Sequence, residues 1–266
     1  IHCLLESDIL AAVKSFVPGS AGGPDGLRHG PASAAPERLN ECLVAKSACR
    51  VVTAKMAERF LPIQLGFGVL RGTEAAVHAT RQYIAGLQPG HGLLKLDFNN
   101  AFNTIRRDAV FDAVRQELPE LYAFVYMCYK DTSLLNFGEN LLKSDEGVQQ
   151  GDPLGPLLHC ASTMKLVRSM TSELNLWYLD DGTIGGELHD LLHDLDTVRR
   201  VGPTIGLLLN EVKCEIVTND DSVVSSFRAV MPNILHTRGN DAVLLGAPIG
   251  DQSAIDNVLH SKLAVF

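Results

Sequence analysis

The fold of this chain is decided by the stretch Leu176-Trp177-Tyr178-Leu179-Asp180-Asp181-Gly182-Thr183-Ile184. Short apolar segments flank an Asp-Asp-Gly sequence, and this arrangement predicts two strands joined by a tight hairpin turn. Two adjacent carboxylates repel each other unless water or a cation offsets their charge. Taken alone, the pair is somewhat better explained by a solvated type I′ turn at Asp181-Gly182 than by a site. The stretch therefore predicts a hairpin and leaves its chemistry open.

A third aspartate follows another apolar segment. Residues Leu93–Phe98 have the length and composition of a buried strand, and Asp97 stands at its end, where a loop cap is the ordinary role. Two strands side by side in one sheet would bring Asp97 to the Asp180-Asp181 pair, and such hard oxygen ligands suit Mg²⁺. Two ions about 3.5–4 Å apart can hold the attacking and leaving oxygens of a phosphoryl transfer. The combination predicts a metal-dependent site, with a nuclease or phosphatase still open.

The rest of the chain predicts helices and short strands in irregular alternation. Amphipathic spacing and breaker residues predict helices near 7–16, 38–60, 73–85, 105–114, 153–172 and 188–198. Strand signals occur at 93–98, 134–148 (a hairpin), 176–184 (a hairpin), 207–209, 215–217 and 243–246. This order is not a regular βαβ series, so the predicted fold class is α+β.

Composition is that of an ordinary globular protein, with 266 residues of which 46% are apolar and 20% charged. The sequence contains no run of eighteen apolar residues, so a membrane-spanning helix is not expected. The six cysteines form no Cys-x-x-Cys pair, and the start lacks both a signal-peptide pattern and an initiator Met. An intracellular piece of a longer protein is therefore expected. The net charge of −8 argues against nucleic-acid binding, because proteins that grip phosphates usually carry a basic surface.

Five motifs, in order, nevertheless resemble those of reverse transcriptases, particularly those of retrotransposons. They are LKLDFNNAFN at 94–103, GVQQGDPLGPL at 147–157, WYLDDG at 177–182, GLLLNEVKC at 206–214 and LLGAPIG at 244–250, and the segment at 18–28 resembles the start of the fingers. The resemblance spans nearly the whole chain. It implies a polymerase palm at 91–250, an antiparallel sheet with helices on one face. Partial fingers would occupy 1–90, and 251–266 would begin the connection toward an absent thumb.

The resemblance implies roles for the acidic residues and their neighbours. Asp97 and Asp180 would bind two Mg²⁺ ions, for which Mn²⁺ is a possible substitute, with Asp181 beside them and the carbonyl of Phe98 as a further ligand. The ions would activate the primer 3′-hydroxyl and neutralise the triphosphate. Lys213 would stabilise or protonate the leaving pyrophosphate, although a solvated lysine explains it almost as well.

Other matched positions would contact the nucleotide and the primer. Phe102 matches the sugar gate that excludes a ribose 2′-hydroxyl, with an ordinary buried aromatic as the alternative. Gln150 and Gly151 would lie under the nascent base pair, where an amide can hydrogen-bond and glycine permits close approach. The primer grip would comprise Leu245, Gly246 and Ala247.

Two basic parts of the family pattern are missing from the sequence. Residues 34–48 lack the Lys- and Arg-rich strand pair of the fingers, which leaves Arg50 and Lys55 as the nearest cations, and no thumb follows. Because both parts are typically basic, their absence accounts for the acidic charge, and it also predicts weak binding of template and primer.

The expected function is RNA-directed DNA polymerisation, in which deoxynucleoside triphosphates extend a primer on an RNA or DNA template. A decayed or domesticated palm that acts as a binding or scaffold module is the alternative. An RNA-directed RNA polymerase would share the palm chemistry, but the bulky Phe102 argues against it.

Overall fold

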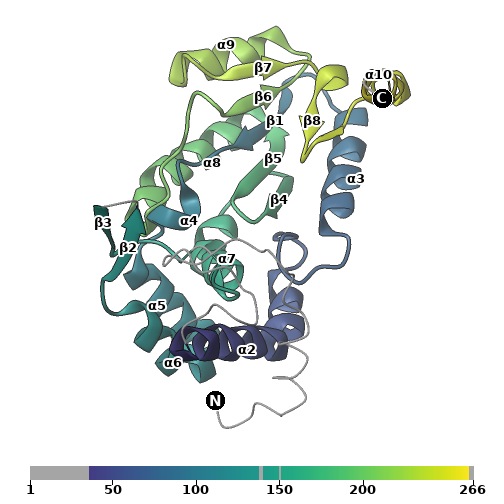
Figure 1. Ribbon diagram of the computed structural model, residues 1–266. Helices are drawn as coiled ribbons and strands as arrows, with labels where there is room; N and C mark the ends of the chain where they lie inside the picture. The colour runs from purple at the N-terminus through teal and green to yellow at the C-terminus, as the bar shows by residue number, and fades with distance from the viewer. Residues whose placement is uncertain (1–35, 138–139, 150, 264–266) are drawn as a thin grey trace. The chain divides into compact units, whose positions relative to one another are not determined.

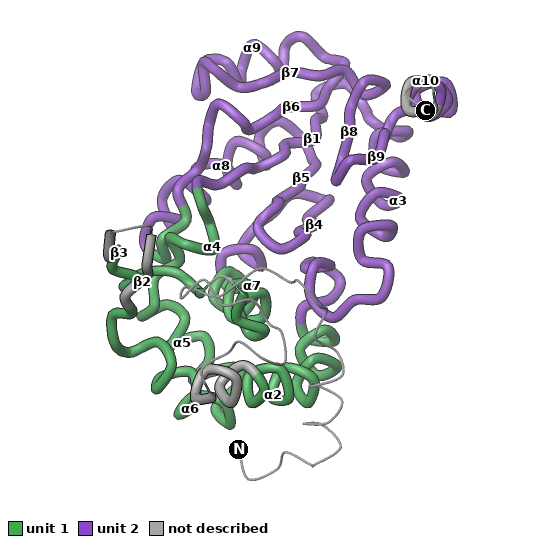
Figure 2. The backbone as a smooth tube through the Cα atoms, in the orientation of Figure 1, with its two compact units in different colours: residues 1–59, 100–165, 205–207 green, residues 60–99, 166–204, 208–266 purple. Residues whose placement is uncertain are grey.

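The computed structural model describes residues 36–137, 140–149 and 151–263, which form two compact units that interleave along the chain (Figures 1 and 2). Unit 1 takes in residues 1–59, 100–165 and 205–207, and unit 2 takes in 60–99, 166–204 and 208–266. Helices and strands alternate irregularly, so the predicted α+β class is confirmed. The helix expected near 7–16 and the fingers-like segment at 18–28 lie outside the described residues.

Unit 2 is built on a five-stranded sheet with the order β4-β5-β1-β6-β7 (Figure 1). The strands are β1 (His91–Leu96), β4 (Leu174–Tyr178), β5 (Asp181–Glu187), β6 (Glu215–Val217) and β7 (Leu235–Thr237). The first four in this order are antiparallel neighbours, whereas β7 runs parallel to β6. The predicted purely antiparallel sheet is therefore wrong at this edge, because a helical crossover connects β6 to β7 and parallel strands need such a connection.

The helices and the second hairpin of unit 2 flank this sheet. They are α3 (Gly72–Ala85), α8 (Leu188–Val201), α9 (Asp221–Val230) and α10 (Gln252–Leu263), with the short hairpin β8 (Val243–Leu244) and β9 (Ala247–Pro248), and the 3-10 turns η1 (Gly202–Ile205, which leads into unit 1) and η2 (Gly239–Asp241).

Helices cover both faces of the sheet. Successive side chains of a strand point to opposite faces, so Gly92 and Leu93 on β1 mark the two sides. A Cβ at Gly92 would lie 3.5 Å from carbons of Leu191 on α8 and Val223 on α9. Leu93 belongs instead to the buried cluster that α3 and the β8–β9 hairpin complete. Within the segment predicted as the palm, α8 and α9 therefore cover one face, and the apolar side of α3, with Ile84, buries the second face.

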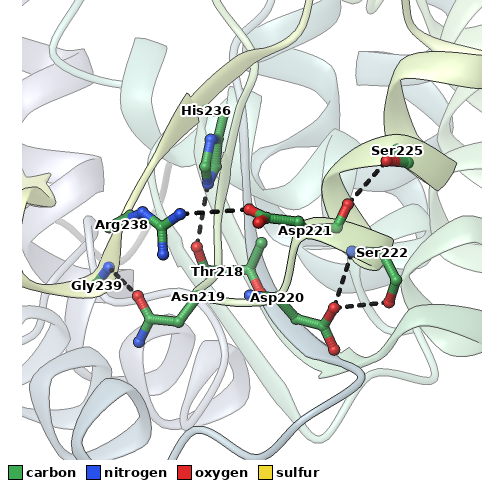
Figure 3. Close-up of polar contacts among 9 residues, drawn as sticks. All are labelled: Thr218, Asn219, Asp220, Asp221, Ser222, Ser225, His236, Arg238 and Gly239. Atoms are coloured by element: carbon green, nitrogen blue, oxygen red, sulfur yellow. Dashed lines mark hydrogen bonds and ion pairs between the residues drawn. The ribbon is translucent and has the colours of Figure 1, made fainter.

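The start of α9 is fixed by a side-chain cap (Figure 3). The Asp220 carboxylate accepts hydrogen bonds from the Ser222 backbone N–H at 2.8 Å and from its hydroxyl at 2.6 Å, which satisfies a free donor of the first turn. Thr218, two residues earlier, donates its hydroxyl to the carbonyl of His91 at 2.8 Å. These bonds fix the junction of β6 and α9 to the beginning of β1.

Unit 1 is mainly helical. Its elements are α2 (Pro36–Phe60), α4 (Ala101–Thr104), α5 (Arg107–Glu117), α6 (Pro119–Tyr129), the hairpin strands β2 (Ser133–Phe137) and β3 (Asn140–Ser144), and most of α7 (Gly155–Val167). Arg59 of α2 pairs with Glu117 of α5 at 2.6 Å, and Lys55 pairs with Glu120 of α6 at 2.8 Å. The predicted end of α2 at Phe60 is confirmed.

Helix α7 is shorter than the predicted 153–172. Asp152 accepts a hydrogen bond from the backbone N–H of Leu154 at 2.9 Å, so the first residues form a turn and the helix begins at Gly155. After Val167 the chain leaves the helix, because the backbone N–H groups and hydroxyls of Thr171 and Ser172 donate to the buried Asp194 carboxylate. Within the described residues, no helix is both long and apolar enough to cross a membrane.

Candidate active site

The register of unit 2 brings the strand-end aspartates to one end of the sheet. The antiparallel ladder pairs Leu96 of β1 with Gly182 of β5, so Asp97 and Asp181 are the next residues along the two paired strands. Asp181 in turn pairs with Tyr178 of β4. The hairpin turn is therefore Leu179-Asp180, and the expected turn at Asp181-Gly182 is wrong.

Gly182, which suggested that turn, is instead required by the packing across the β4–β5 strand pair. Gly182 lies opposite Trp177 across the β4–β5 pair, and a Cβ there would come within 2.8 Å of the indole ring. The ring, only 1% exposed, also stacks on Phe98 with a centroid distance of 6.0 Å. An aromatic layer therefore lies beneath the strand ends that carry the aspartates.

The three carboxylates share one electrostatic neighbourhood. Partial burial raises the pKa of Asp180, and the negative charge of Asp97 raises it further. Burial likewise raises the pKa of Asp181, with additional contributions from Asp180 and Asp97, while the positive charge of Lys95 opposes the rise. Holding all three carboxylates ionised is therefore unfavourable unless positive charge is supplied.

This donor set fits a divalent cation chemically. Crowded carboxylates are hard oxygen ligands, and a cation would offset the repulsion that raises the pKa values. Among residues 36–137, 140–149 and 151–263, no three His, Cys, Asp or Glu side chains are already arranged to hold a metal ion.

The backbone after Asp97 offers a further oxygen. Phe98 bridges Leu209 in an antiparallel arrangement, in which Asn99 N–H donates to the carbonyl of Leu208 and Asn210 N–H donates to that of Asp97, each at 2.8 Å. In the described part of the chain, no group donates to the carbonyl of Phe98. That carbonyl is therefore available as the further ligand that the sequence resemblance implies.

Two lysines of the matched motifs belong to unit 2 together with these aspartates, Lys95 on β1 and Lys213 in the turn before β6. Lys95 shares a strand face with Asp97 by alternation, and its ammonium donates to Glu215 at 2.5 Å and to the carbonyl of Val243 at 2.9 Å. The sequence pattern gave Lys95 no role. Lys213, the predicted pyrophosphate contact, is exposed in the turn before β6.

Sequence reasoning missed Gln64. This side chain is 1% exposed, and its amide bonds both backbone groups of Leu179 in the β4–β5 turn. The only signal was a polar residue between apolar Ile63 and Leu65, ahead of a glycine-rich loop.

The predicted primer grip forms the tight β8–β9 hairpin. Leu244 pairs with Ala247, and the two turn residues, Leu245 and Gly246, have positive φ angles of 48° and 79°. Leu244 and Leu245 line a pocket together with Asp181 of β5. This pocket connects the predicted grip to the aspartate end of the sheet.

Of the residues predicted to contact the nucleotide, Phe102 and Gly151 belong to unit 1 and Phe98 belongs to unit 2, whereas Gln150 lies outside the described residues. Phe102 on α4 is half-buried, and its ring stacks on His159 of α7 with a centroid distance of 4.3 Å and an interplanar angle of 13°. Burial lowers the pKa of His159 to about 4, so the imidazole is neutral at pH 7. Gly151 has a φ of 86°, a conformation that favours glycine.

The loop before α7 is tied down by buried polar groups of unit 1. The Tyr129 hydroxyl donates to Asp152 and accepts from the backbone N–H of Gln149. The Arg107 guanidinium, on a residue only 8% exposed, donates to the backbone carbonyls of Tyr129, Asp131, Ser144, Glu146 and Gly147. Neither residue was singled out from the sequence, because both bond backbone groups distant in the chain.

Comparison with known proteins gives a consistent result. The chain is 28% identical over 192 residues to the retrotransposable element SLACS 132 kDa protein of Trypanosoma brucei gambiense, an alignment that covers 66% of this chain and 16% of that protein. The fold is similar to apo telomerase from Candida tropicalis, with a TM-score of 0.52, 10% identity, and coverage of 68% of this chain and 37% of the telomerase.

A telomerase from Candida albicans, in complex with the TWJ fragment of telomeric RNA, is similar with a TM-score of 0.50, 11% identity, and coverage of 69% of this chain and 35% of that one. Residues 42–240 match the family model described as reverse transcriptase (RNA-dependent DNA polymerase), a range that includes all three aspartates but not the β8–β9 hairpin. This chain therefore belongs to the reverse transcriptase family, whose members are nucleotidyltransferases that polymerise DNA on RNA.

Proposed function

We propose that this chain catalyses RNA-directed DNA synthesis, extending a primer 3′-hydroxyl with deoxynucleoside triphosphates. The observation that carries the proposal is the register of β1 and β5, which sets Asp97 beside Asp181 and the Asp180 turn at one sheet end. Reverse transcriptases generally use divalent metal ions, and the raised pKa values of Asp180 and Asp181 support a site that needs positive charge.

The aspartates would hold two Mg²⁺ ions, with Mn²⁺ as a substitute and the Phe98 carbonyl as an added ligand. Bound there, the ions would activate the primer hydroxyl and neutralise the triphosphate. Lys95 is paired with Glu215, and this ion pair carries no net charge. Lys95 therefore does not neutralise Asp97 by itself. Lys213, exposed beside β6, would approach the leaving pyrophosphate once substrate is bound.

The remaining roles follow from the family resemblance. Phe102, supported by His159, would exclude the ribose 2′-hydroxyl, and Gln150 and Gly151 would lie under the nascent base pair. Leu245, Gly246 and Ala247 would guide the primer. In this proposal residues 91–250 form the palm and 1–90 the partial fingers, with 251–266 leading toward a thumb.

Primer extension on an RNA template with Mg²⁺ and the four deoxynucleotides tests the proposal. We expect extension by the wild type and none by Asp180→Asn. A matched control is Asp221→Asn, which removes an exposed carboxylate from the first turn of α9 and should leave extension unchanged. No extension by this chain, and none after basic fingers and a thumb are restored, would contradict the proposal and return the scaffold alternative.

A further inference from the structure

We propose that Gln64 is a positioning residue that fixes the backbone of the Leu179-Asp180 turn and thereby the placement of the catalytic carboxylates. The inference rests on the proposed function and deepens it. Gln64 Nε2 donates to the carbonyl of Leu179 at 2.9 Å, and Leu179 N–H donates to Gln64 Oε1 at 2.8 Å. The same oxygen accepts the N–H of Gly66 at 2.9 Å. One side chain therefore holds both backbone groups of the residue before Asp180.

Gln64 is itself held by backbone contacts. Its segment forms a parallel bridge with Trp177, in which Leu65 N–H donates to the carbonyl of Trp177 and Trp177 N–H donates to that of Ile63, each at 2.7 Å. The segment thus extends the sheet by one short pairing beside β4. With 1% exposure, the Gln64 amide has no competing water, so its bonds to Leu179 are directed and stable.

The turn needs this support because its conformation is unfavourable for its sequence. Leu179 has a φ of 57°, in the left-handed region that leucine rarely adopts. Such a conformation persists only where the surroundings determine it. If the bonds from Gln64 are removed, the turn is free to relax, and Asp180 moves with it because it is the next residue.

Gly66 also lies very close to the Leu179 turn. A Cβ at this position would lie 2.4 Å from the backbone nitrogen of Leu179 and 2.8 Å from its Cγ. Glycine is therefore required for the loop to pack against the turn. Gln64 and Gly66 together form a clamp on Leu179.

The expected consequence is on catalysis more than on substrate binding. A displacement of about 1 Å in a reacting constellation can lower the rate about 100-fold. None of the clamp atoms is proposed to contact the nucleotide, so the KM for deoxynucleotides should change little while kcat falls. The divalent ion concentration needed for half-maximal binding should rise, because a mobile turn would hold Asp180 and Asp181 less well beside Asp97.

Gln64→Met removes all three hydrogen bonds at similar volume, and Gln64→Glu keeps the acceptor but loses the donor. Thr218→Val is the matched control in the same unit, since Thr218 is also 1% exposed and bonds a backbone carbonyl, at the opposite end of β1. Gln64→Met should lower kcat about 100-fold at nearly unchanged KM. Hydrogen exchange at the Leu179 amide should accelerate at least about tenfold in Gln64→Met but stay slow in Gln64→Glu and Thr218→Val.

Metal binding is measured separately by titrating Mn²⁺ and recording water-proton relaxation, with a weaker midpoint expected for Gln64→Met only. Unchanged Leu179 exchange in Gln64→Met would overturn the clamp whether or not the wild type extends a primer. Loss of kcat in Gln64→Met that merely parallels its thermal destabilisation, as in Thr218→Val, would overturn it too. If Gln64→Met does not fold, Gln64→Asn, whose amide is one methylene shorter, is measured in its place, and Leu179 exchange as slow as in the wild type contradicts the clamp. A wild type that extends no primer defeats the proposed function while the exchange measurement still tests the clamp.

Discussion

Unit 2 contains two tight hairpins, and each has a leucine at positive φ in its turn. The β4–β5 turn places Leu179 at a φ of 57°, and the β8–β9 turn places Leu245 at a φ of 48°. The first turn is held from outside, because Gln64 bonds both backbone groups of Leu179. The second turn continues into Gly246, also at positive φ, and among the residues that the structure describes nothing lies within 4 Å of where a Cβ at that glycine would be.

The difference shows where the molecule fixes atomic positions most firmly. Both residues of the β8–β9 turn have positive φ, as in a type I′ turn, and Gly246 adopts this conformation without strain, so only Leu245 is strained there. The β4–β5 turn has Asp180 in place of that glycine, and its geometry is imposed by a segment 115 residues away. We infer that an external clamp is used where side chains beside the turn must be aimed.

The largest effect is expected from removing an aspartate at the end of the sheet that carries the first hairpin. Asp97→Asn should lower primer extension about 1,000-fold or more, because a metal ligand and its charge are lost together. The same change should bring the pKa values of Asp180 and Asp181 down, since the charge of Asp97 raises both. Steady-state kinetics and a carboxyl titration by NMR measure the two effects. Asp221→Asn, in the exposed first turn of α9 and outside both hairpins, is the control and should leave both readouts unchanged. Equal activity in Asp97→Asn and wild type would rule out its role as a ligand.

A second comparison uses the carboxylates that flank each hairpin. Burial and neighbouring charges raise the native pKa of Asp181, so the unfolded chain ionises this group more readily and the free energy of unfolding falls as pH rises through the raised pKa. Asp251, just after β9, has its pKa lowered by the backbone N–H of Ala254 and by Ser253, so its contribution to stability is lost as pH falls through that lowered pKa.

Replacing aspartate by asparagine is therefore expected to change the unfolding temperature in opposite directions at the two positions. Without metal at pH 7, Asp181→Asn should unfold at a higher temperature than the wild type, and Asp251→Asn at a lower one. Both differences should shrink as the pH falls toward and below the ordinary aspartate pKa of about 3.9. Thermal unfolding followed by circular dichroism from pH 3 to 8 measures them. Destabilisation by Asp181→Asn at pH 7 would contradict the electrostatic account of the first hairpin.

The smallest expected effects separate steric from conformational requirements for glycine. Gly66→Ala forces a Cβ to within 2.4 Å of Leu179 N, so it should lower the free energy of unfolding by about 1–3 kcal/mol and reduce primer extension. Gly246→Ala meets no neighbour in the described part of the chain and should lower that free energy by only about 1 kcal/mol, from its φ of 79° alone. Chemical denaturation gives both values. A larger loss for Gly246→Ala than for Gly66→Ala would reverse the comparison between the hairpins.

Local patterns were sufficient to predict the strands that carry the aspartates. An apolar run that ends in Asp97, and two short runs around Asp180, indicated β1, β4 and β5 correctly, because burial and turn preference act over a few residues. The exact turn was misplaced, since Gly182 is required by the ring of Trp177 across the strand pair and not by a turn. Cross-strand packing of this kind is not visible in a local pattern.

Contacts distant in sequence account for most of what the sequence did not predict. Gln64 acts on a residue 115 positions away, and Arg107 bonds carbonyls as far as 40 positions away. The second face of the sheet is covered by α3. The apolar stripe of this helix indicates that one side is buried, but it does not indicate which part of the chain packs against it. The role of Asp97 as a metal ligand stays a prediction, which primer extension by Asp97→Asn tests.

The interleaving of the two units has a consequence for how the chain is made. Each unit is assembled from three separate stretches, so neither can be excised as a contiguous fragment. The central strand β1 leaves the ribosome long before its partners, because Leu94 pairs with Ile184 and Ile216. Its apolar segment must wait for more than 80 further residues, roughly 4–20 seconds at ordinary rates of synthesis. Newly made chains should therefore depend on chaperones that shield this strand until β5 arrives.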